Sequence, residues 1–332
     1  MNLQRKLPDQ GMKQSPKRKQ NYPHRHGVLT MAEGTVLILG AGASKPYGFP
    51  LGSELRDTIL KSLSFPESEE VKLLQNCGFN IDDIRKFRSE LHDAIHNTID
   101  DFLSDRPSHR GIGSLSIVMA LRYCESPNSL FPKRDWYPEL VKVLGLDGKP
   151  SSIDAILTLN YDRSLEHYLY HTVRVSFEGE KRTKAFQRLA EIPIIHLHGI
   201  LGKYVPGSFD MDKDLSPEKC MEIAEELRIT SDESLDQSEV FARARDICLK
   251  ASQIYFLGFG YHERILDRLG FKDNWNDAFD KKKMPLIYGT GKNMAGKHIM
   301  SLHEKYNSKF TIDDRYDAHS FFKEVIIPNL GA

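Results

Sequence analysis

Five short apolar segments, each ended by glycine or a polar residue, constrain the fold of this chain more than any other feature of its sequence. The segments are Thr35–Leu39, Ala155–Leu159, Ile192–Leu197, Gln253–Leu257 and Leu286–Tyr288. Apolar residues occupy both odd and even positions in them, which is typical of strands buried on both faces of a parallel sheet. Since helical patterns lie between the segments, the sequence predicts an α/β fold with a mostly parallel sheet and helices on both faces.

The stretch from residue 51 to residue 150 separates the first two predicted strands and is too long for a simple crossover. We interpret it as a mostly helical insertion. Its clearest pattern spaces apolar residues three or four positions apart, which predicts one apolar stripe on a single helix. The stripe consists of Ile81, Ile84, Phe87, Leu91, Ile95, Ile99 and Phe102. Residues 206–238, rich in Ser, Asp and Glu, predict a loop with an exposed helix.

The charges of the chain balance, with 46 Lys and Arg against 46 Asp and Glu, which argues against a dedicated nucleic-acid or membrane-surface protein. Residues 1–33 are the exception, because they hold seven Lys or Arg and only Asp9 and Glu33 as acidic residues. We expect a basic, flexible arm, or an extension upstream of a start at Met31. The alternative is an arm that docks on nucleic acid or on an acidic partner.

The cysteines and the apolar segments indicate the compartment. The four cysteines are widely spaced and form no C-x-x-C pair, which argues against a zinc ribbon and fits reduced thiols. No signal-peptide pattern opens the sequence, and no apolar stretch approaches the roughly 20 residues that span a bilayer. We therefore expect a cytoplasmic protein without a membrane partner.

A glycine-rich turn directly follows the first predicted strand and consists of Gly40, Ala41, Gly42, Ala43 and Ser44. Glycines between a strand and a helix let the backbone approach a pyrophosphate, whose charge is met by amide groups and the helix N-terminus. The dehydrogenase pattern G-x-G-x-x-G fails here, because Lys45 occupies its third glycine position. By itself the turn indicates a dinucleotide or other phosphate site, or a plain tight turn.

Three further polar clusters follow later strands in the same way. Thr158-Leu159-Asn160-Tyr161-Asp162 ends the second predicted strand, His196-Leu197-His198-Gly199 ends the third, and Gly258-Phe259-Gly260 ends the fourth. In a parallel sheet all carboxyl ends lie at one edge, and ligands bind in the crevice outside that edge. The four clusters are therefore expected to meet in space, as in a Rossmann-like nucleotide-binding sheet.

This combination resembles the sirtuin superfamily, whose members carry G-A-G-x-S, T-x-N-x-D, H-G and a late G-x-G in that order. The four-cysteine zinc module of protein deacylases is missing, because only Cys220 and Cys248 lie between the H-G pair and Gly258. Asn160 and His198 are 38 positions apart, a spacing similar to that in sirtuin-like domains of bacterial antiphage defence proteins, which hydrolyse NAD. The resemblance therefore implies that residues 34–332 form a sirtuin-like catalytic domain that takes NAD as substrate and needs no metal.

The resemblance also implies roles for individual residues. Asn160 would hold the nicotinamide ribose or the attacking water, His198 would be the general base, and Asp162 would grip the carboxamide or orient its loop. The implied NAD-binding set is Gly40, Ala41, Gly42, Ala43, Ser44, Thr158, Asp162, Gly258 and Gly260. Within it, Ser44 and the amides of residues 41–43 would hold phosphate, and the two late glycines would admit the adenosine ribose.

Structural explanations compete with these roles. Asn160 and Asp162 are also common helix-capping residues. His196 and His198, two apart, would face the same way on a strand, and His196 is either a supporting group or a buried histidine bonded to backbone. Three other groups indicate exposed helix flanks or loops instead of sites: His92 with His96, His167 with His171, and Lys281-Lys282-Lys283.

The leading hypothesis from the sequence is an NAD glycohydrolase that releases nicotinamide and ADP-ribose and defends its cell against phage by depleting NAD. The alternatives are an NAD-dependent protein deacylase or ADP-ribosyltransferase, and a non-catalytic sensor of NAD or ADP-ribose that regulates a partner. Because an unrestrained NAD hydrolase is toxic, we expect control by homo-oligomer assembly or by a separate partner. Related sirtuin-like effectors use both devices, including a HerA-like hexameric ATPase.

Overall fold

The computed structural model of the protein describes residues 34–131, 135–206, 216–230, 232–271, 285–292, 294–306 and 310–331. The basic arm predicted at residues 1–33 and the run Lys281–Lys283 lie outside the described residues, as does part of the segment 206–238. Within the described ranges, every helix is too short or too polar to cross a membrane.

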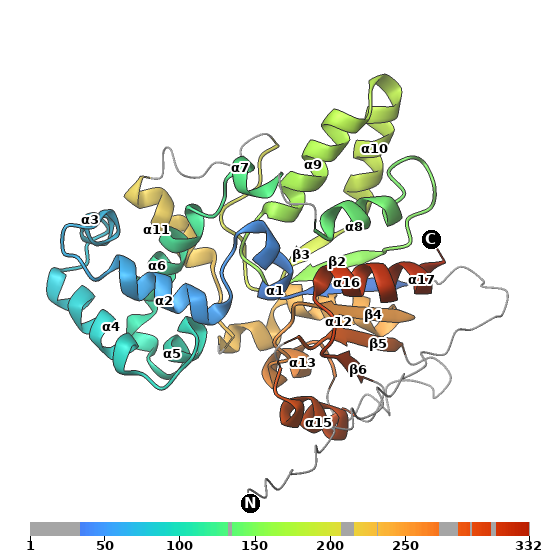
Figure 1. The fold of residues 1–332 in the computed structure, drawn as a ribbon. Helices are drawn as coiled ribbons and strands as arrows, with labels where there is room; N and C mark the ends of the chain where they lie inside the picture. Colours follow the sequence, from blue (N-terminus) through green and yellow to red (C-terminus); the bar gives the residue numbers. More distant parts are fainter. Residues whose placement is uncertain are drawn as a thin grey trace, which may run out of the picture. The chain divides into compact units, whose positions relative to one another are not determined.

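The core of the fold is a six-stranded sheet in which every neighbouring pair of strands is parallel (Figure 1). Its spatial order is β3-β2-β1-β4-β5-β6, the order of a Rossmann-like sheet. The strands are β1 (Thr35–Leu39), β2 (Ala155–Thr158), β3 (Ile194–His196), β4 (Gln253–Leu257), β5 (Leu286–Thr290) and β6 (Phe310–Asp313). The predicted α/β class and parallel sheet are thereby confirmed. Strand β6 was not predicted from the sequence, and the third predicted strand is longer at both ends than the observed β3.

Helices cover both faces of the sheet, because alternate residues of each strand point to opposite sides. Val36 and Ile38 of β1 share one hydrophobic cluster with residues of α12 (Glu239–Lys250), α13 (Glu263–Arg268) and α15 (Gly296–Lys305). Leu37 and Leu39 share the other cluster with a second set of helices. That set includes α8 (Tyr137–Val143), α9 (Ser164–Ser176), α10 (Gly179–Glu191), α16 (Ala318–Phe321) and the π-helical turn η4 (Phe322–Ile326).

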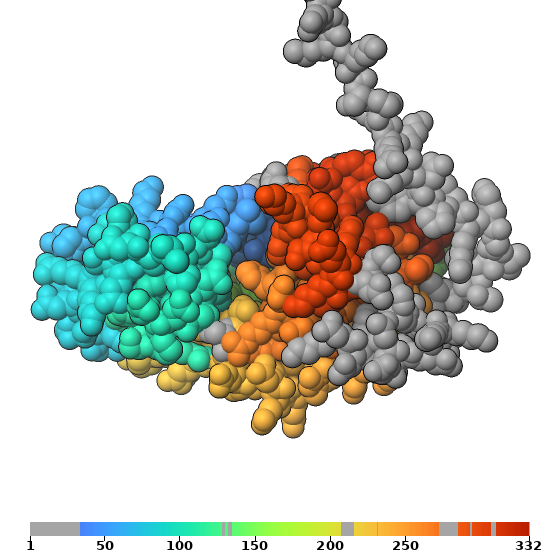
Figure 2. Space-filling view, turned by 90° about the horizontal axis from the view of Figure 1, so that it is seen from below, coloured from blue at the N-terminus to red at the C-terminus, as the bar shows by residue number. Residues whose placement is uncertain are grey.

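A second group of helices, here called the helical module, is built from two separate parts of the chain. Its first part follows β1, and its second part is α11 (Pro217–Glu226), which comes after β3 and packs against α6 and α3 (Figure 1). The first part contains α2 (Gly52–Ser62), α3 (Glu69–Asn76), α4 (Ile81–Asp93), α5 (Ile99–Asp105) and α6 (Arg110–Arg122). Figure 2 shows the atoms of this first part, in blue to green, gathered at one side of the surface.

The helical segment predicted at residues 51–150 therefore differs from the observed module in two ways. The module takes in α11 from outside that range, and it leaves α8 to the layer beside the sheet, where α8 packs against α9 and η4. Helix α6 is the centre of the module, because every residue from Ile112 to Arg122 is buried. A helix that is buried on all sides needs neighbours on all sides, and α11 supplies one of them.

The apolar stripe predicted on one helix is divided between α4 and α5, so that prediction was wrong. Helix α4 ends at Asp93, and α5 begins at Ile99 after the capping residue Thr98, whose hydroxyl accepts a hydrogen bond from the Asp101 N–H at 3.1 Å. The Arg56 guanidinium stabilises the break by donating to the Leu91 and His92 carbonyls, at 2.8 and 3.2 Å.

The break also changes the surroundings of two residues that the spacing placed on one helix. Ile95 lies between the helices and is 93% exposed, outside the apolar stripe. His96 pairs with Asp105 at 2.9 Å, whereas His92 remains on α4. The two histidines therefore share no helix face.

Candidate functional site

The glycine-rich turn after β1 and the loop after β4 meet at the point where the strand order of the sheet reverses. The chain goes from β1 outward to β2 and β3, and it returns to the other side of β1 as β4. The Gly40 N–H donates to the Leu257 carbonyl at 3.0 Å, and the Gly42 N–H donates to the Gly258 carbonyl at 2.9 Å. Ligands of open parallel sheets bind in the crevice at such a switch point.

The glycines of these two loops are needed because the loops pack backbone against backbone. A Cβ atom on Gly40 would lie 2.6 Å from the Gly258 carbonyl oxygen. A Cβ atom on Gly258, whose φ is +58°, would lie 2.2 Å from the Ala43 nitrogen. These glycines are therefore needed for the approach of one loop to the other, while the roles of Gly40 toward a pyrophosphate and of Gly258 toward the adenosine ribose stay predictions.

Some of the backbone amide groups of the turn, which were predicted to hold phosphate, donate hydrogen bonds within the protein. The Gly42 N–H is bonded to Gly258, and the Ala43 N–H donates to the Gly40 carbonyl at 2.9 Å. The helix that follows, α1 (Ala41–Ser44), is a single turn and is succeeded by the 3₁₀ turn η1 (Lys45–Tyr47). Two of the three expected phosphate-binding amides are thus already engaged within the protein.

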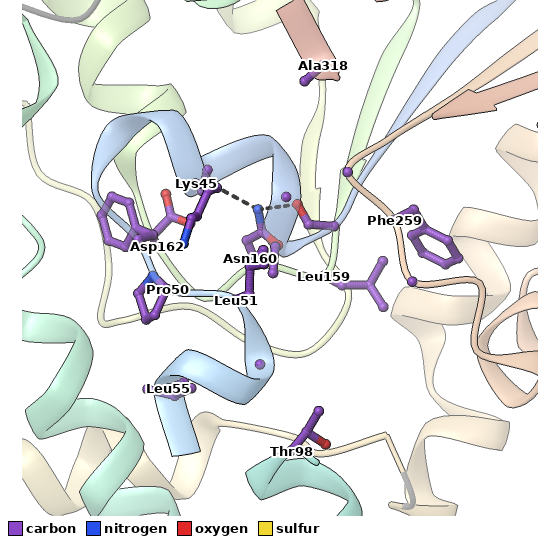
Figure 3. Close-up of a pocket in the computed structure, with 18 of the residues that line it drawn as sticks. Lys45, Pro50, Leu51, Leu55, Thr98, Leu159, Asn160, Asp162, Phe259 and Ala318 are labelled. Atoms are coloured by element: carbon purple, nitrogen blue, oxygen red, sulfur yellow. Dashed lines mark hydrogen bonds between the residues drawn. The ribbon is translucent and has the colours of Figure 1, made fainter. Parts of the chain in front are cut away.

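A pocket of about 650 Å³ opens between the two loops, the β2–α9 loop and the helical module. This volume is within the range of small-molecule sites. All of the predicted site residues line it except Ala43 and Thr158. Ala43 and Thr158 are both buried behind the residues that line the pocket. The Thr158 hydroxyl accepts a hydrogen bond from the Asn160 N–H at 3.1 Å. In Figure 3, Asn160 lies beside the α1 turn, and Thr98 of the helical module lies across the pocket from it.

Asn160 connects the β2–α9 loop to the glycine-rich turn. Its Nδ2 donates to the Gly40 carbonyl at 3.0 Å and to Ser44 Oγ at 2.8 Å (Figure 3). Both side-chain donors are therefore committed, which leaves Oδ1 as the side-chain atom that a ligand or water can use. Because Asn160 bonds to the turn and not to the start of α9, the capping explanation does not apply to it.

Asp162 lies one residue before Arg163, the N-cap residue of α9, and bonds the start of that helix without capping it. Its Oδ1 accepts the Ser164 N–H at 3.1 Å and the Ser164 hydroxyl, so it orders the first turn of α9. Burial raises the pKa of Asp162, while its hydrogen bonds with Ser164 and Ser44 act in the opposite direction. Ser44 thus lies between Asn160 and Asp162 in one hydrogen-bonded group.

His198 lies in the pocket wall and is only 4% exposed. Its ring centroid is 6.5 Å from that of Tyr161 and 6.3 Å from that of Phe241. Burial lowers the pKa of His198 to about 3, with a further contribution from the Arg268 charge, so the ring is neutral at pH 7. Its Nε2 is buried and has no hydrogen-bond partner among the described residues, which leaves a polar atom that a bound ligand can satisfy.

His196 has surroundings different from those of His198, so the prediction that both face the same way was wrong. Strand β3 ends at His196, and the chain turns before His198. His196 Nδ1 lies 2.8 Å from the Asn160 carbonyl oxygen, and Nε2 lies 2.6 Å from Glu166 Oε1. Burial opposes the charged ring, but the Glu166 carboxylate outweighs burial and raises the pKa of His196. His196 is a supporting group that holds the Asn160 backbone.

A buried ion pair joins the β2–α9 loop to the chain that follows α6. Glu125 Oε1 accepts both the backbone N–H and the Nε–H of Arg163, each at 3.1 Å. Burial raises the pKa of Glu125 to about 7 against the effect of Arg163. Because the pair also bonds the Arg163 backbone, it holds in place the loop that carries Asn160 and Asp162.

Several pocket residues were not identified from the sequence, and Asp100 and Asp101 of α5 are the clearest cases. Their pattern, Thr98-Ile99-Asp100-Asp101, signals only a capped helix start. At the other end of the pocket, Lys292 and Asp317 form an ion pair at 2.7 Å. Nothing in the sequence pattern distinguishes these residues from surface charges, because the tertiary packing alone brings them to the pocket.

A metal site is not formed by the part of the chain that the structure describes, since no three His, Cys, Asp or Glu side chains gather there in a suitable way. The four cysteines all lie within the described ranges and form no disulfide, and burial raises the pKa of the Cys248 thiol to about 12. That the protein needs no metal stays a prediction.

No family model and no curated protein matches the chain. Among solved structures, it is similar to a crystal structure of Sir2 in complex with the inhibitor EX-527, 2'-O-acetyl-ADP-ribose and a deacetylated p53 peptide. That match has 16% identity, covers 90% of this chain and 94% of the other, and gives a TM-score of 0.39. A structure of Sir2Tm bound to a propionylated peptide matches with 15% identity, the same coverage and a TM-score of 0.40. Both are proteins of the family that the sequence motifs resemble.

Proposed function

We propose that this chain is an NAD glycohydrolase, which cleaves NAD to nicotinamide and ADP-ribose. The observation that carries the proposal is the junction of Asn160 with Gly40 and Ser44 beside His198, in a pocket at the switch point of the sheet. The pocket extends from these residues past Gly258 to Lys292 and Asp317, so it crosses the carboxyl edge from β2 to β5. Such an elongated site suits a dinucleotide.

The chemistry of NAD cleavage matches the groups available. Nicotinamide leaves a cationic precursor as a neutral molecule, so its departure requires no proton donor. The site must instead stabilise a ribose that resembles an oxocarbenium ion and position a water molecule. Asn160 Oδ1 and the neutral His198 ring supply acceptors at that position, and neither adds positive charge beside the developing cation.

The experiment that tests the proposal is incubation of the pure protein with NAD and chromatographic measurement of nicotinamide and ADP-ribose. Release of both without an acceptor supports the proposal. Release that depends on an acylated peptide would identify a deacylase, and transfer to a protein would identify an ADP-ribosyltransferase. Tight NAD binding without turnover would identify a sensor.

We extend the proposal to defence against phage by NAD depletion, on the strength of the motif resemblance. Restraint of the enzyme would come from homo-oligomer assembly or from a partner such as a HerA-like ATPase. Light scattering beside an activity titration tests this control, because turnover should change strongly with assembly. A monomer with full turnover at every concentration contradicts it. Loss of phage protection and of cellular NAD depletion in an inactive variant tests the defence role.

A further inference from the structure

Asp100 brings a carboxylate into the pocket from the helical module. It is the second residue of α5, one position after Ile99 and two after the capping residue Thr98. Thr98 lies across the pocket from Asn160 (Figure 3), and Asp100 lines the same pocket as Asn160 and His198. The carboxylate therefore belongs to the site although its helix is far from the four motifs in sequence.

Tyr161 connects the Asp100 carboxylate to the β2–α9 loop, which carries the predicted catalytic residue Asn160. The Tyr161 hydroxyl donates to the Arg228 carbonyl at 2.9 Å and, over a longer distance, to Asp100 Oδ1 at 3.4 Å. The Arg228 N–H in turn donates to the His198 carbonyl at 2.8 Å. Since Tyr161 directly follows Asn160, one aromatic ring separates the carboxylate from the loop that carries Asn160. The shorter of its two hydrogen bonds is to Arg228, so its bond to Asp100 is the weaker of the two.

Three of the other polar side chains of the site, those of Asn160, His198 and Asp162, are poorly suited to remove a proton from water. Both amide hydrogens of Asn160 are bonded within the protein, and an amide oxygen is not a base. His198 has its pKa lowered to about 3 by burial, so it binds a proton only weakly at pH 7. Asp162 Oδ1 is occupied by two hydrogen bonds from Ser164.

We propose that Asp100 is the general base of the reaction, an inference that rests on the proposed NAD cleavage. The bond between nicotinamide and C1' of the ribose breaks, and its electron pair leaves with nicotinamide. A water oxygen forms the new bond to C1', and the water proton passes to the Asp100 carboxylate, from which it returns to solvent. The net reaction converts NAD and water into nicotinamide, ADP-ribose and one proton.

The charges around Asp100 are consistent with this role. Burial and, to a smaller extent, the neighbouring Asp101 carboxylate raise the pKa of Asp100 to about 6, against the hydrogen bond from the Tyr161 hydroxyl, which lowers it. From α6, Arg110 is near Tyr161 but is paired with Asp232 at 2.5 Å. Asp100 is therefore mostly ionised at pH 7 and becomes protonated below about pH 6.

The test compares kcat/KM for NAD from pH 5 to 9 in the wild type, Asp100→Asn and Asp105→Asn. In the wild type we expect kcat/KM to fall as the pH decreases below about 6. At pH 7.5 the Asp100→Asn variant should be slower by a factor of about 10²–10⁴, and its kcat/KM should no longer fall in this way at acidic pH. Sodium formate should partly restore turnover in Asp100→Ala, because a small carboxylate can replace the missing base. ADP-ribose affinity in Asp100→Asn should stay within about threefold of the wild type.

Asp105→Asn is the matched control, because Asp105 is on the same helix, is exposed and lies outside the pocket. It should behave as the wild type. Wild-type cleavage with an unchanged rate and acid limb in Asp100→Asn would overturn the role of Asp100 alone. Absence of nicotinamide release from the wild type would overturn the proposed function, and this assignment with it.

Discussion

The side-chain amide of Asn160 donates a hydrogen bond to Ser44 Oγ at 2.8 Å across 116 residues of sequence. The same Nδ2 atom holds the Gly40 carbonyl, so one amide group connects the loops after β2 and β1. An amide is required there, because a carboxylate has no hydrogen to donate to a carbonyl oxygen. The geometry of the site thus depends on the donor and not only on the size of the side chain.

Asn160→Asp keeps the size of the side chain and removes both donors. We expect this variant to lose more than about 10² in NAD cleavage, because its carboxylate would face the Gly40 carbonyl and distort the turn. Asn160→Ala and His198→Ala should also lose most activity, with circular dichroism unchanged. His92→Ala, an exposed change on α4, is the control and should keep wild-type turnover. Normal turnover in folded Asn160→Asp and His198→Ala would show that the site is elsewhere.

Glu125→Ala should destabilise the protein by about 3–5 kcal/mol, because it leaves the buried Arg163 charge without its partner. Denaturant unfolding measures the change. Glu180→Ala removes a fully solvated pair with Lys184 on α10 and is the control, with no measurable loss expected. Equal effects of the two substitutions would mean that the buried pair does not hold the loop after β2.

Gly258→Ala should displace the glycine-rich turn, since the new Cβ would lie 2.2 Å from the Ala43 nitrogen. Gly179 offers a matched control, because its φ of +51° is close to the +58° of Gly258 but no atom lies within 4 Å of its added Cβ. Gly179→Ala should cost only the backbone strain, about 1–2 kcal/mol. We expect Gly258→Ala to cost more in thermal unfolding and to abolish turnover. Equal thermal stability and equal turnover of Gly258→Ala and Gly179→Ala would contradict the close packing of the two loops.

The ion pair of His196 with Glu166 should make stability depend on pH. Since the folded pKa of His196 is raised above 6.5, its contribution is fully present below pH 6.5 and is lost as pH rises through the folded pKa. The difference in unfolding free energy between the wild type and His196→Gln should therefore be larger at pH 5.5 than at pH 9. If the difference in unfolding free energy instead increased with pH, His196 would not be charged in the folded protein.

Treatment with EDTA should change neither the melting temperature nor NAD cleavage, because we expect the protein to need no metal. Elemental analysis of the untreated protein checks the same point. A stoichiometric zinc would contradict the prediction and favour the deacylase alternative.

The strands could be predicted from the sequence because parallel strands buried on both faces leave an unbroken apolar signal, as in Thr35–Leu39. Strand β6 escaped notice because Thr311 and Asp313 interrupt that signal, although Phe310 and Ile312 are buried. The division of the stripe at Asp93 escaped notice for a different reason. The apolar spacing continues across the break, and the Arg56 contacts that stabilise it come from another helix.

The meeting of the four motifs could be predicted because parallel strands place their carboxyl ends at one edge. The contributions from the helical module could not, because they depend on how α5 packs and not on any local pattern. Asp100 therefore appears in sequence as an ordinary residue of a first helical turn. The burial of Ala43 likewise depends on a tertiary contact that no motif specifies, since its carbonyl accepts the Trp136 indole N–H at 2.8 Å.

The assembly of the helical module from two distant parts of the chain has a consequence for biosynthesis. Helix α6 leaves the ribosome about 95 residues before α11, one of the helices that cover it. At roughly 5–20 residues per second, the part of the nascent α6 surface that α11 covers stays exposed for about 5–20 s. During that interval the incomplete protein presents a binding surface for chaperones and for other nascent copies, and truncation before residue 217 makes this exposure permanent.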